Sequence, residues 1–132
     1  MPKGKWRLTV TEQFSAAHQL RGHSGACERL HGHNFGVEVE VEGDRLSDDL
    51  EILIDFKELK TMVREILAEL DHRHLNDLPP FAEHNPSSEN LARHIYQALA
   101  ARLAASPSAR HARPRQVAVS EKESSRAVYL EE

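Results

Sequence analysis

The sequence has little of several features that would decide its class at once. Its single cysteine cannot form a disulfide within the chain, which fits a reducing compartment. No apolar run approaches the ~18 residues that a membrane span needs, and the start MPKGKWRLTV lacks the apolar stretch of a secretory signal. The net charge of −4 argues against general nucleic-acid binding. We therefore expect a cytoplasmic protein that binds neither membrane nor nucleic acid.

Histidine, by contrast, is plentiful. The chain has nine histidines among 132 residues, and no two are adjacent. A count says little by itself, so the positions of these histidines must decide whether they form a site. The length and an ordinary 39% of hydrophobic residues predict a single domain over residues 1–132.

Two stretches alternate between apolar and polar residues with the period of a β-strand. In residues 6–18 the apolar side chains stand mainly at even-numbered positions. In residues 34–42 phenylalanine and valines stand at odd-numbered positions and alternate mainly with glutamates. These patterns predict two strands. The outer face of the second strand, with Glu38, Glu40 and Glu42, is expected to be exposed to water.

The apolar period becomes helical after residue 54. Asp55 stands where a helix N-cap is expected, and Glu58 occupies the capping-box position three residues later. Apolar residues then recur at helical spacing up to Leu70. Residues 85–88, NPSS, lead into a second helical pattern that ends near Leu103.

The last part of the chain returns to strands. Residues 106–114 are loop by composition, a strand begins at Val117, and residues 126–130 predict a returning strand. The order β-β-α-α-β-β predicts an α+β fold with four strands and two helices. Such an open sheet has two edges, which oligomerisation would cover.

The segment CERLHGHN, residues 27–34, holds the most suggestive histidines. His31 and His33 share the inward parity of the second strand, and a hairpin between the first two strands would place His18 beside them. Three neutral imidazoles from adjacent strands make a three-ligand site with a free fourth position, which is the pattern of catalytic zinc. The alternative is a set of buried histidines that backbone groups satisfy.

The lone cysteine also has two interpretations. A single Cys is most often an inert buried thiol. Cys27 stands instead in the polar loop RGHSGACER, near Arg21 and Arg29, and neighbouring positive charge favours the reactive thiolate. A thiolate beside an open zinc site is suited to remove a proton that the metal acidifies.

Other candidate groups each have a plain alternative. Asp71 would orient the ring of His72 and set its tautomer, or the two residues form only a solvated helix end. A strand-end carboxylate such as Glu121 is usually solvated, but a buried one would accept paired N–H bonds from a heterocycle edge. Ser88 and Glu89 begin a helix and belong first to its capping segment.

Six segments, spread in one order along nearly the whole chain, carry a resemblance. They are FSAAHQL (14–20), CERLHGHN (27–34), IDFKELK (54–60), LDHRHLND (70–77), NPSSENLA (85–92) and VSEKESSRAVY (119–129). Together they resemble the 6-pyruvoyl-tetrahydropterin synthase / 6-carboxy-tetrahydropterin synthase family, of the tunnelling fold. Each segment alone is modest evidence, but six in order are highly specific. The resemblance implies a four-stranded antiparallel sheet with both helices on one face.

The resemblance also implies zinc ligands, catalytic residues and pterin contacts. The implied ligands of one Zn²⁺ per subunit are His18, His31 and His33. The implied catalytic base is Cys27, with Asp71 and His72 as its partners in proton transfer. The implied pterin contacts are Glu121, which would accept the ring's amide and amino N–H groups, and Ser88 and Glu89 near the ring edge.

The spacing Cys-x3-His-Gly-His distinguishes the branches of the family. The 6-carboxy enzymes of 7-deazapurine (queuosine) biosynthesis carry this spacing, whereas 6-pyruvoyl enzymes typically have a longer insertion. The resemblance therefore implies a lyase that converts 7,8-dihydroneopterin triphosphate to 6-carboxy-5,6,7,8-tetrahydropterin, acetaldehyde and triphosphate. It also implies homo-oligomers, trimers that close a barrel and stacked hexamers, with active sites between subunits. Lys122 departs from the threonine that usually follows the family's glutamate.

Three alternatives stay open from the sequence. A 6-pyruvoyl-tetrahydropterin synthase would eliminate triphosphate without cleaving a carbon–carbon bond, or the protein would bind zinc and pterin without catalysis. A structural zinc module would use Cys27 as a fourth ligand and close the site. Product analysis separates the first alternative, and loss of zinc from a Cys27 variant would mark the last.

Overall fold

The computed structural model describes residues 2–22 and 29–132, and Cys27 lies outside these ranges. Four strands form one antiparallel sheet in the order β1-β2-β3-β4. The strands are β1 (Trp6–His18), β2 (His31–Gly43), β3 (Arg113–Lys122) and β4 (Ser125–Tyr129). The third strand begins four residues before the expected Val117, because Arg113 and Pro114 already pair with the end of β2.

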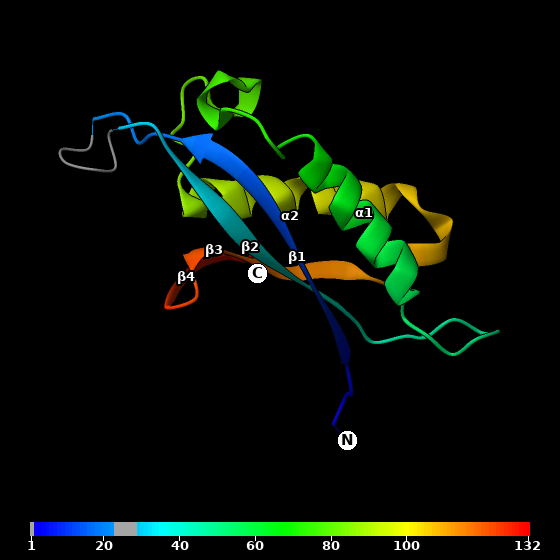
Figure 1. The fold of residues 1–132 in the computed structure, drawn as a ribbon. Helices are drawn as coiled ribbons and strands as arrows, with labels where there is room; N and C mark the ends of the chain where they lie inside the picture. The colour runs from blue at the N-terminus through cyan, green and yellow to red at the C-terminus, as the bar shows by residue number, and fades with distance from the viewer. Residues whose placement is uncertain (1, 23–28) are drawn as a thin grey trace.

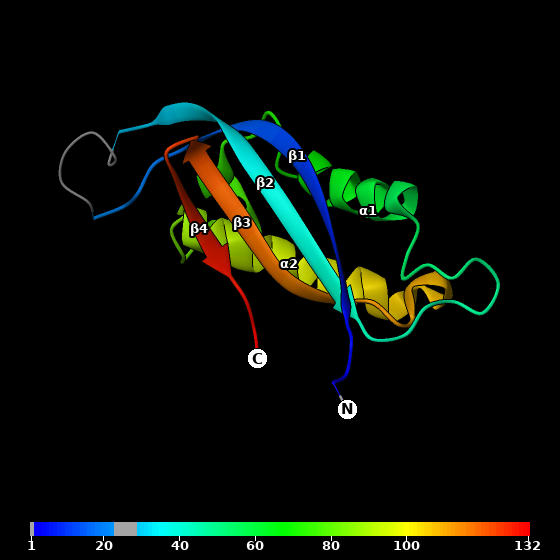
Figure 2. The same cartoon turned by 90° about the horizontal axis from the view of Figure 1, so that it is seen from below.

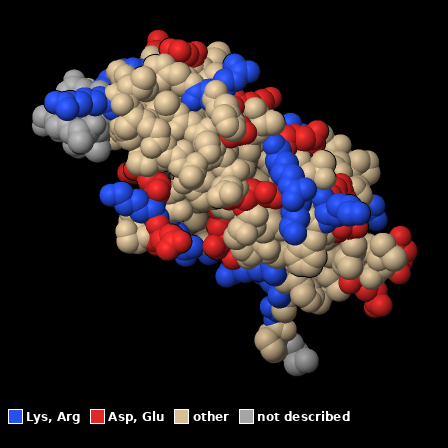
Figure 3. All heavy atoms as spheres, viewed as in Figure 1, with Lys and Arg blue, Asp and Glu red and all other residues tan. Residues whose placement is uncertain are grey.

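Two helices, α1 (Phe56–Ala68) and α2 (Ser88–Ala105), cover the same face of the sheet (Figure 1). Seen from below, the strands lie in front and both helices behind them (Figure 2). The order β-β-α-α-β-β is confirmed, and the described residues add three short 3-10 helices between the main elements (Leu75–Asp77, Pro79–Phe81 and Pro107–Ala109). No helix within the described ranges is both long and apolar enough to cross a membrane. Acidic and basic side chains are interspersed on the face drawn in Figure 3.

The helix caps follow the sequence pattern only in part. The side chain of Asp55 accepts a hydrogen bond from the Lys57 N–H and so caps α1, as expected. Glu58 does not complete a capping box, because its carboxylate accepts hydrogen bonds from Ser106 Oγ at 2.9 Å and Ser108 Oγ at 2.5 Å. It therefore joins the start of α1 to the segment that follows α2.

The register of the first two strands sets the inner face of the sheet. Phe14 lies opposite Phe35, and their rings stack with centroids 4.9 Å apart. Both rings are buried in one hydrophobic cluster that includes residues of both helices. Every second residue along both strands faces this same side, and the paired register ends with His18 opposite His31.

The outer face of β2 differs from the expected solvated row of glutamates at one position. Glu42 is only 5% exposed, because basic side chains surround its carboxylate. The nearest are Arg113 at 2.8 Å and Arg7 at 3.1 Å. Hydrogen bonding from Arg113 holds the pKa of the Glu42 carboxyl below its ordinary value of 4.5, although burial acts in the opposite direction.

We expect Glu42→Gln to lower the free energy of unfolding by about 1–2 kcal/mol at neutral pH, because charge-assisted hydrogen bonds to half-exposed guanidinium groups are lost. Since the folded-state pKa lies below 4.5, the stabilisation is complete above that pH and is lost as the pH falls through the folded value. Urea unfolding across pH measures the difference between variant and wild type. Glu38→Gln is the matched control: Glu38 lies on the same face, and among the described residues Arg126 is its one ion-pair partner. A difference that stays constant into acid would contradict this account.

Candidate metal centre and substrate pocket

Three histidines meet at the end of the β1–β2 hairpin. Ala16 lies opposite His33 and His18 lies opposite His31, so the strand register places all three rings on the inner face. Each histidine offers one ring nitrogen, and these three nitrogens all lie within 4.8 Å of one another. The hairpin that the sequence predicted therefore does bring these side chains together.

Backbone carbonyls fix which nitrogen two of the histidines present to the centre. The Nδ1 atom of His18 lies 2.7 Å from the Pro86 carbonyl oxygen, and that of His31 lies 2.7 Å from the Arg29 carbonyl oxygen. A carbonyl only accepts hydrogen bonds, so each Nδ1 carries the proton and each Nε2 keeps a free lone pair. This is the outer-shell arrangement that orients metal-ligating histidines.

The Nε2 atoms of His18 and His33 are buried, and neither has a hydrogen-bond partner among the described residues. The carboxylate of Glu121 faces both, with Oε1 3.4 Å from His18 Nε2 and Oε2 3.3 Å from His33 Nε2. Burial lowers the pKa of His18, although the Pro86 carbonyl and the Glu121 charge oppose that effect. Unpaired Nε2 lone pairs of buried imidazoles have a metal cation as their natural complement, and the nearby carboxylate charge of Glu121 favours a cation there.

The donor set fits zinc. Two nitrogens bound to the same Zn²⁺ at about 2.1 Å are at most about 4.2 Å apart, so only small ring movements separate this arrangement from ligation. Among residues 2–22 and 29–132, no further histidine or cysteine joins the three imidazoles, and a three-imidazole set leaves a position for substrate, as in catalytic zinc sites. The residues present therefore suit a metal ion that takes part in chemistry.

A pocket of about 560 Å³ adjoins the histidine cluster through Glu121. Ser88 and Glu89, from the first turn of α2, line it together with residues of β4. Ser87 caps this helix by accepting the Asn90 N–H at 3.1 Å, which confirms the capping segment expected from the sequence. The structure thus brings together all three side chains that the sequence proposed as substrate contacts.

Asp71 and His72 form a pair just beyond α1. His72 Nδ1 lies 2.9 Å from Asp71 Oδ2, and Asp71 Oδ1 accepts the Ser15 N–H at 2.9 Å. These hydrogen bonds, from Ser15 first and His72 second, lower the pKa of the Asp71 carboxyl. The His72 side chain is 81% exposed, and its backbone φ of 57° is uncommon for a residue with a Cβ atom.

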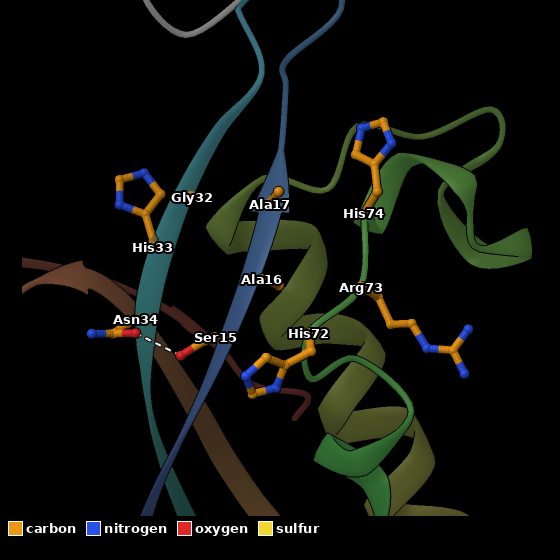
Figure 4. A pocket seen from close by; sticks show the side chains of 9 residues that line it. All are labelled: Ser15, Ala16, Ala17, Gly32, His33, Asn34, His72, Arg73 and His74. Atoms are coloured by element: carbon orange, nitrogen blue, oxygen red, sulfur yellow. Dashed lines mark hydrogen bonds between the residues drawn. The ribbon is translucent and has the colours of Figure 1, made fainter.

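The Asp71–His72 pair does not adjoin Glu121 within this chain. His72 and His33 line a second pocket, of about 550 Å³, that lacks Glu121, Ser88 and Glu89. Figure 4 shows the backbone of β1 passing between the strand that carries His33 and the segment that carries His72. The structure therefore divides the proposed residues of one chain between two pockets, both of which reach the histidine cluster.

Sequence reasoning missed several groups at this site. The carbonyls of Pro86 and Arg29 orient ligand rings, but backbone groups leave no sequence signal. A second carboxylate–histidine pair, His74 Nδ1 to Asp77 Oδ2 at 3.1 Å, lies in the same LDHRHLND segment. Its His-x-x-Asp spacing is the sequence signal that could have indicated this pair.

Comparison with known proteins places these features in a class. A family model described as 6-pyruvoyl tetrahydropterin synthase matches residues 7–132. The chain is 38% identical over 98 residues to the 6-carboxy-5,6,7,8-tetrahydropterin synthase of a Synechocystis species, covering 71% of this chain and 74% of the relative. It is 39% identical over 88 residues to the dihydroneopterin monophosphate aldolase of Pyrococcus furiosus, covering 67% of this chain and 69% of the relative.

The fold agrees with that class. The structure of Caenorhabditis elegans 6-pyruvoyl tetrahydropterin synthase aligns with a TM-score of 0.80, covering 100% of this chain and 99% of the other, at 21% identity. At that identity the likeness concerns the fold alone. Because the family model spans nearly the entire sequence, the chain belongs to the 6-pyruvoyl tetrahydropterin synthase family.

Proposed function

We propose that the protein is a zinc-dependent lyase, a 6-carboxy-5,6,7,8-tetrahydropterin synthase. Its substrate would be 7,8-dihydroneopterin triphosphate, and its products 6-carboxy-5,6,7,8-tetrahydropterin, acetaldehyde and triphosphate, in 7-deazapurine (queuosine) biosynthesis. The observation that carries the proposal is the convergence of His18, His31 and His33 beside a pocket that Glu121 lines. The names of relatives such as the Synechocystis enzyme support the same activity.

The binding groups suit a pterin with hydroxyls on its side chain. Zinc held by His18, His31 and His33 would supply Lewis acidity that promotes loss of a proton from the substrate's side chain. Glu121 would accept the paired N–H groups of the pterin ring, because its carboxylate is partly buried and lines the pocket. Ser88 and Glu89 would lie beside the ring at the other wall.

Proton transfer is assigned to Cys27, Asp71 and His72. The Cys27 thiolate would remove a side-chain proton, and His72 would relay protons while Asp71 holds its ring through Nδ1. Loss of the proton is followed by departure of triphosphate. One water molecule then adds to the side-chain carbon next to the ring, and cleavage of the carbon–carbon bond leaves the carboxyl group on the ring and releases acetaldehyde. Cys27 lies outside the described residues, so its assignment rests on the sequence.

Incubation of the purified, zinc-loaded protein with 7,8-dihydroneopterin triphosphate tests the reaction. We expect equal amounts of acetaldehyde and 6-carboxy-5,6,7,8-tetrahydropterin. Release of triphosphate with a 6-pyruvoyl product would support the alternative synthase, and binding without turnover would support a non-catalytic pterin protein. Because one relative is named as an aldolase of dihydroneopterin monophosphate, the monophosphate belongs in the same assay, and preferential turnover of it would reject the triphosphate assignment.

We also propose that the protein works as a homo-oligomer, a trimer or hexamer with active sites between subunits. In the part of the chain that the structure describes, the outer edge of β4 pairs with no strand. Val128 and Leu130 near that edge are 41% and 38% exposed, and Trp6 at the other edge is 46% exposed. Assembly would also bring the Asp71–His72 pair of one chain to the pocket of another. Sedimentation is expected to show no stable monomer at micromolar concentration.

A further inference from the structure

Near the histidine cluster, the edge of β1 that faces away from β2 pairs mainly with the segment after α1. The Ser15 carbonyl accepts the His72 N–H at 2.6 Å, and the Ala17 N–H donates to the Arg73 carbonyl at 3.0 Å. The chain leaves β1 after His18, and the backbone groups of residues 19 and 21 in the segment that follows need partners too.

Two asparagine side chains supply those partners. Gln19 donates its N–H to Asn76 Oδ1 at 2.9 Å, and its carbonyl accepts from Asn76 Nδ2 at 2.9 Å. Arg21 makes the same pair of bonds with Asn85, at 2.9 Å to Oδ1 and 3.1 Å from Nδ2. Each amide thus pairs with both backbone groups of one residue, as a neighbouring strand would. We call Asn76 and Asn85 the edge amides.

Further contacts hold the edge amides in place. The Arg21 guanidinium donates to the carbonyls of Asn76 at 3.2 Å and Phe81 at 2.7 Å. The Asn90 side chain, from the first turn of α2, donates to the Asn85 carbonyl at 2.8 Å. These bonds connect the segment directly after β1, the segment after α1 and the start of α2 at one point. The Arg21 side chain is therefore engaged within the fold.

His18 lies inside this arrangement. It sits between Ala17 and Gln19 in the chain, and its Nδ1 donates to Pro86, the residue directly after Asn85. Its ring is fully buried among closely packed atoms. If the backbone moved, the ring would therefore have little free space in which to turn back to its original position. The strand β2 restrains His18 from one side only, and the edge amides restrain the chain from the other.

We propose that Asn76 and Asn85 are positioning residues of the metal centre, which hold residues 19 and 21 so that His18 presents Nε2 to the ion. This inference rests on the proposed zinc site. Removing either amide leaves two backbone groups of the segment directly after β1 without their partners, and it loosens the chain on either side of His18 and Pro86. Outer-shell changes of this kind typically weaken metal binding about 10–100-fold.

Zinc affinity of the full-length protein, measured by chelator competition, tests the proposal together with the visible spectrum of the Co²⁺-substituted protein. We expect Asn76→Ala and Asn85→Ala each to bind zinc about 10–100-fold more weakly and to change the Co²⁺ bands. Asn85→Asp keeps the acceptor for the Arg21 N–H but loses the donor, so its affinity is expected to lie between those of Asn85→Ala and wild type.

Two control variants separate positioning from loss of stability. Gln13→Ala removes an exposed amide from β1 away from the edge amides, and Glu42→Gln removes a buried contact at the far end of the sheet. Both are expected to keep wild-type zinc affinity and spectrum. Wild-type zinc affinity and Co²⁺ spectrum in both Asn76→Ala and Asn85→Ala would overturn the inference and leave the zinc site intact. If the alanine variants do not fold, wild-type values in Asn85→Asp would overturn it in the same way. Failure of the wild type itself to bind zinc would overturn the proposed function.

Discussion

Replacing His31 with alanine is expected to abolish stoichiometric zinc binding and to reduce turnover by at least about 100-fold. His31 supplies one of the three nitrogens that the described residues bring to the centre, and its Nδ1 bond to the Arg29 carbonyl directs the other nitrogen toward that centre. Loss of a directly bound ligand should exceed the 10–100-fold effect of outer-shell changes. Metal analysis after gel filtration and chelator competition measure the change.

An exposed histidine provides the matched control for this variant. His84→Ala removes an imidazole from the connection before α2 that does not belong to the three-histidine group. We expect that variant to keep one zinc per chain and wild-type turnover. If His31→Ala retained one tightly bound zinc per chain, the assignment of His18, His31 and His33 as the ligand set would be wrong.

Cys27→Ala is expected to fold, to keep one zinc per chain and to lose turnover by about 10²–10⁴-fold, the usual contribution of a positioned general base. The thiol is proposed to act on the substrate and not to bind the ion, so metal content and catalysis should separate in this variant. Zinc analysis and single-turnover formation of acetaldehyde measure the two properties on the same preparation.

The same variant distinguishes a catalytic centre from a structural one. If Cys27 were a fourth zinc ligand, Cys27→Ala would lose zinc affinity and thermal stability together. Retained zinc with near-wild-type turnover would reject Cys27 as the base but keep the metal centre. Cys27→Ser, which keeps a weaker proton acceptor of similar size, should recover little of the lost rate.

Much of the histidine cluster could be predicted because it depends on strand parity. His31 and His33 share the inward row of β2, and pairing with the preceding strand was enough to bring His18 beside them. The N-cap at Asp55 and the capping segment at Ser87 were also readable, since both depend on residues a few positions apart.

Contacts between distant segments could not be read in the same way. The buried state of Glu42 depends on Arg113, which is 71 residues away and belongs to a stretch that composition alone suggested as loop. Asn76 and Asn85 meet residues 57 and 64 positions earlier, and an asparagine that imitates a neighbouring strand has the same letters as one in a turn. Such pairings follow from how the segment after α1 packs on the sheet, which local patterns do not encode.

The side-by-side register of the first two strands has a consequence for folding quality. Because side chains alternate faces, a slip of one residue between Trp6–His18 and His31–Gly43 would send the imidazoles of one strand to the opposite surface. A mispaired hairpin would therefore be unable to gather the three nitrogens. Ion uptake by a freshly refolded sample would then report the fraction of chains whose strands have aligned properly.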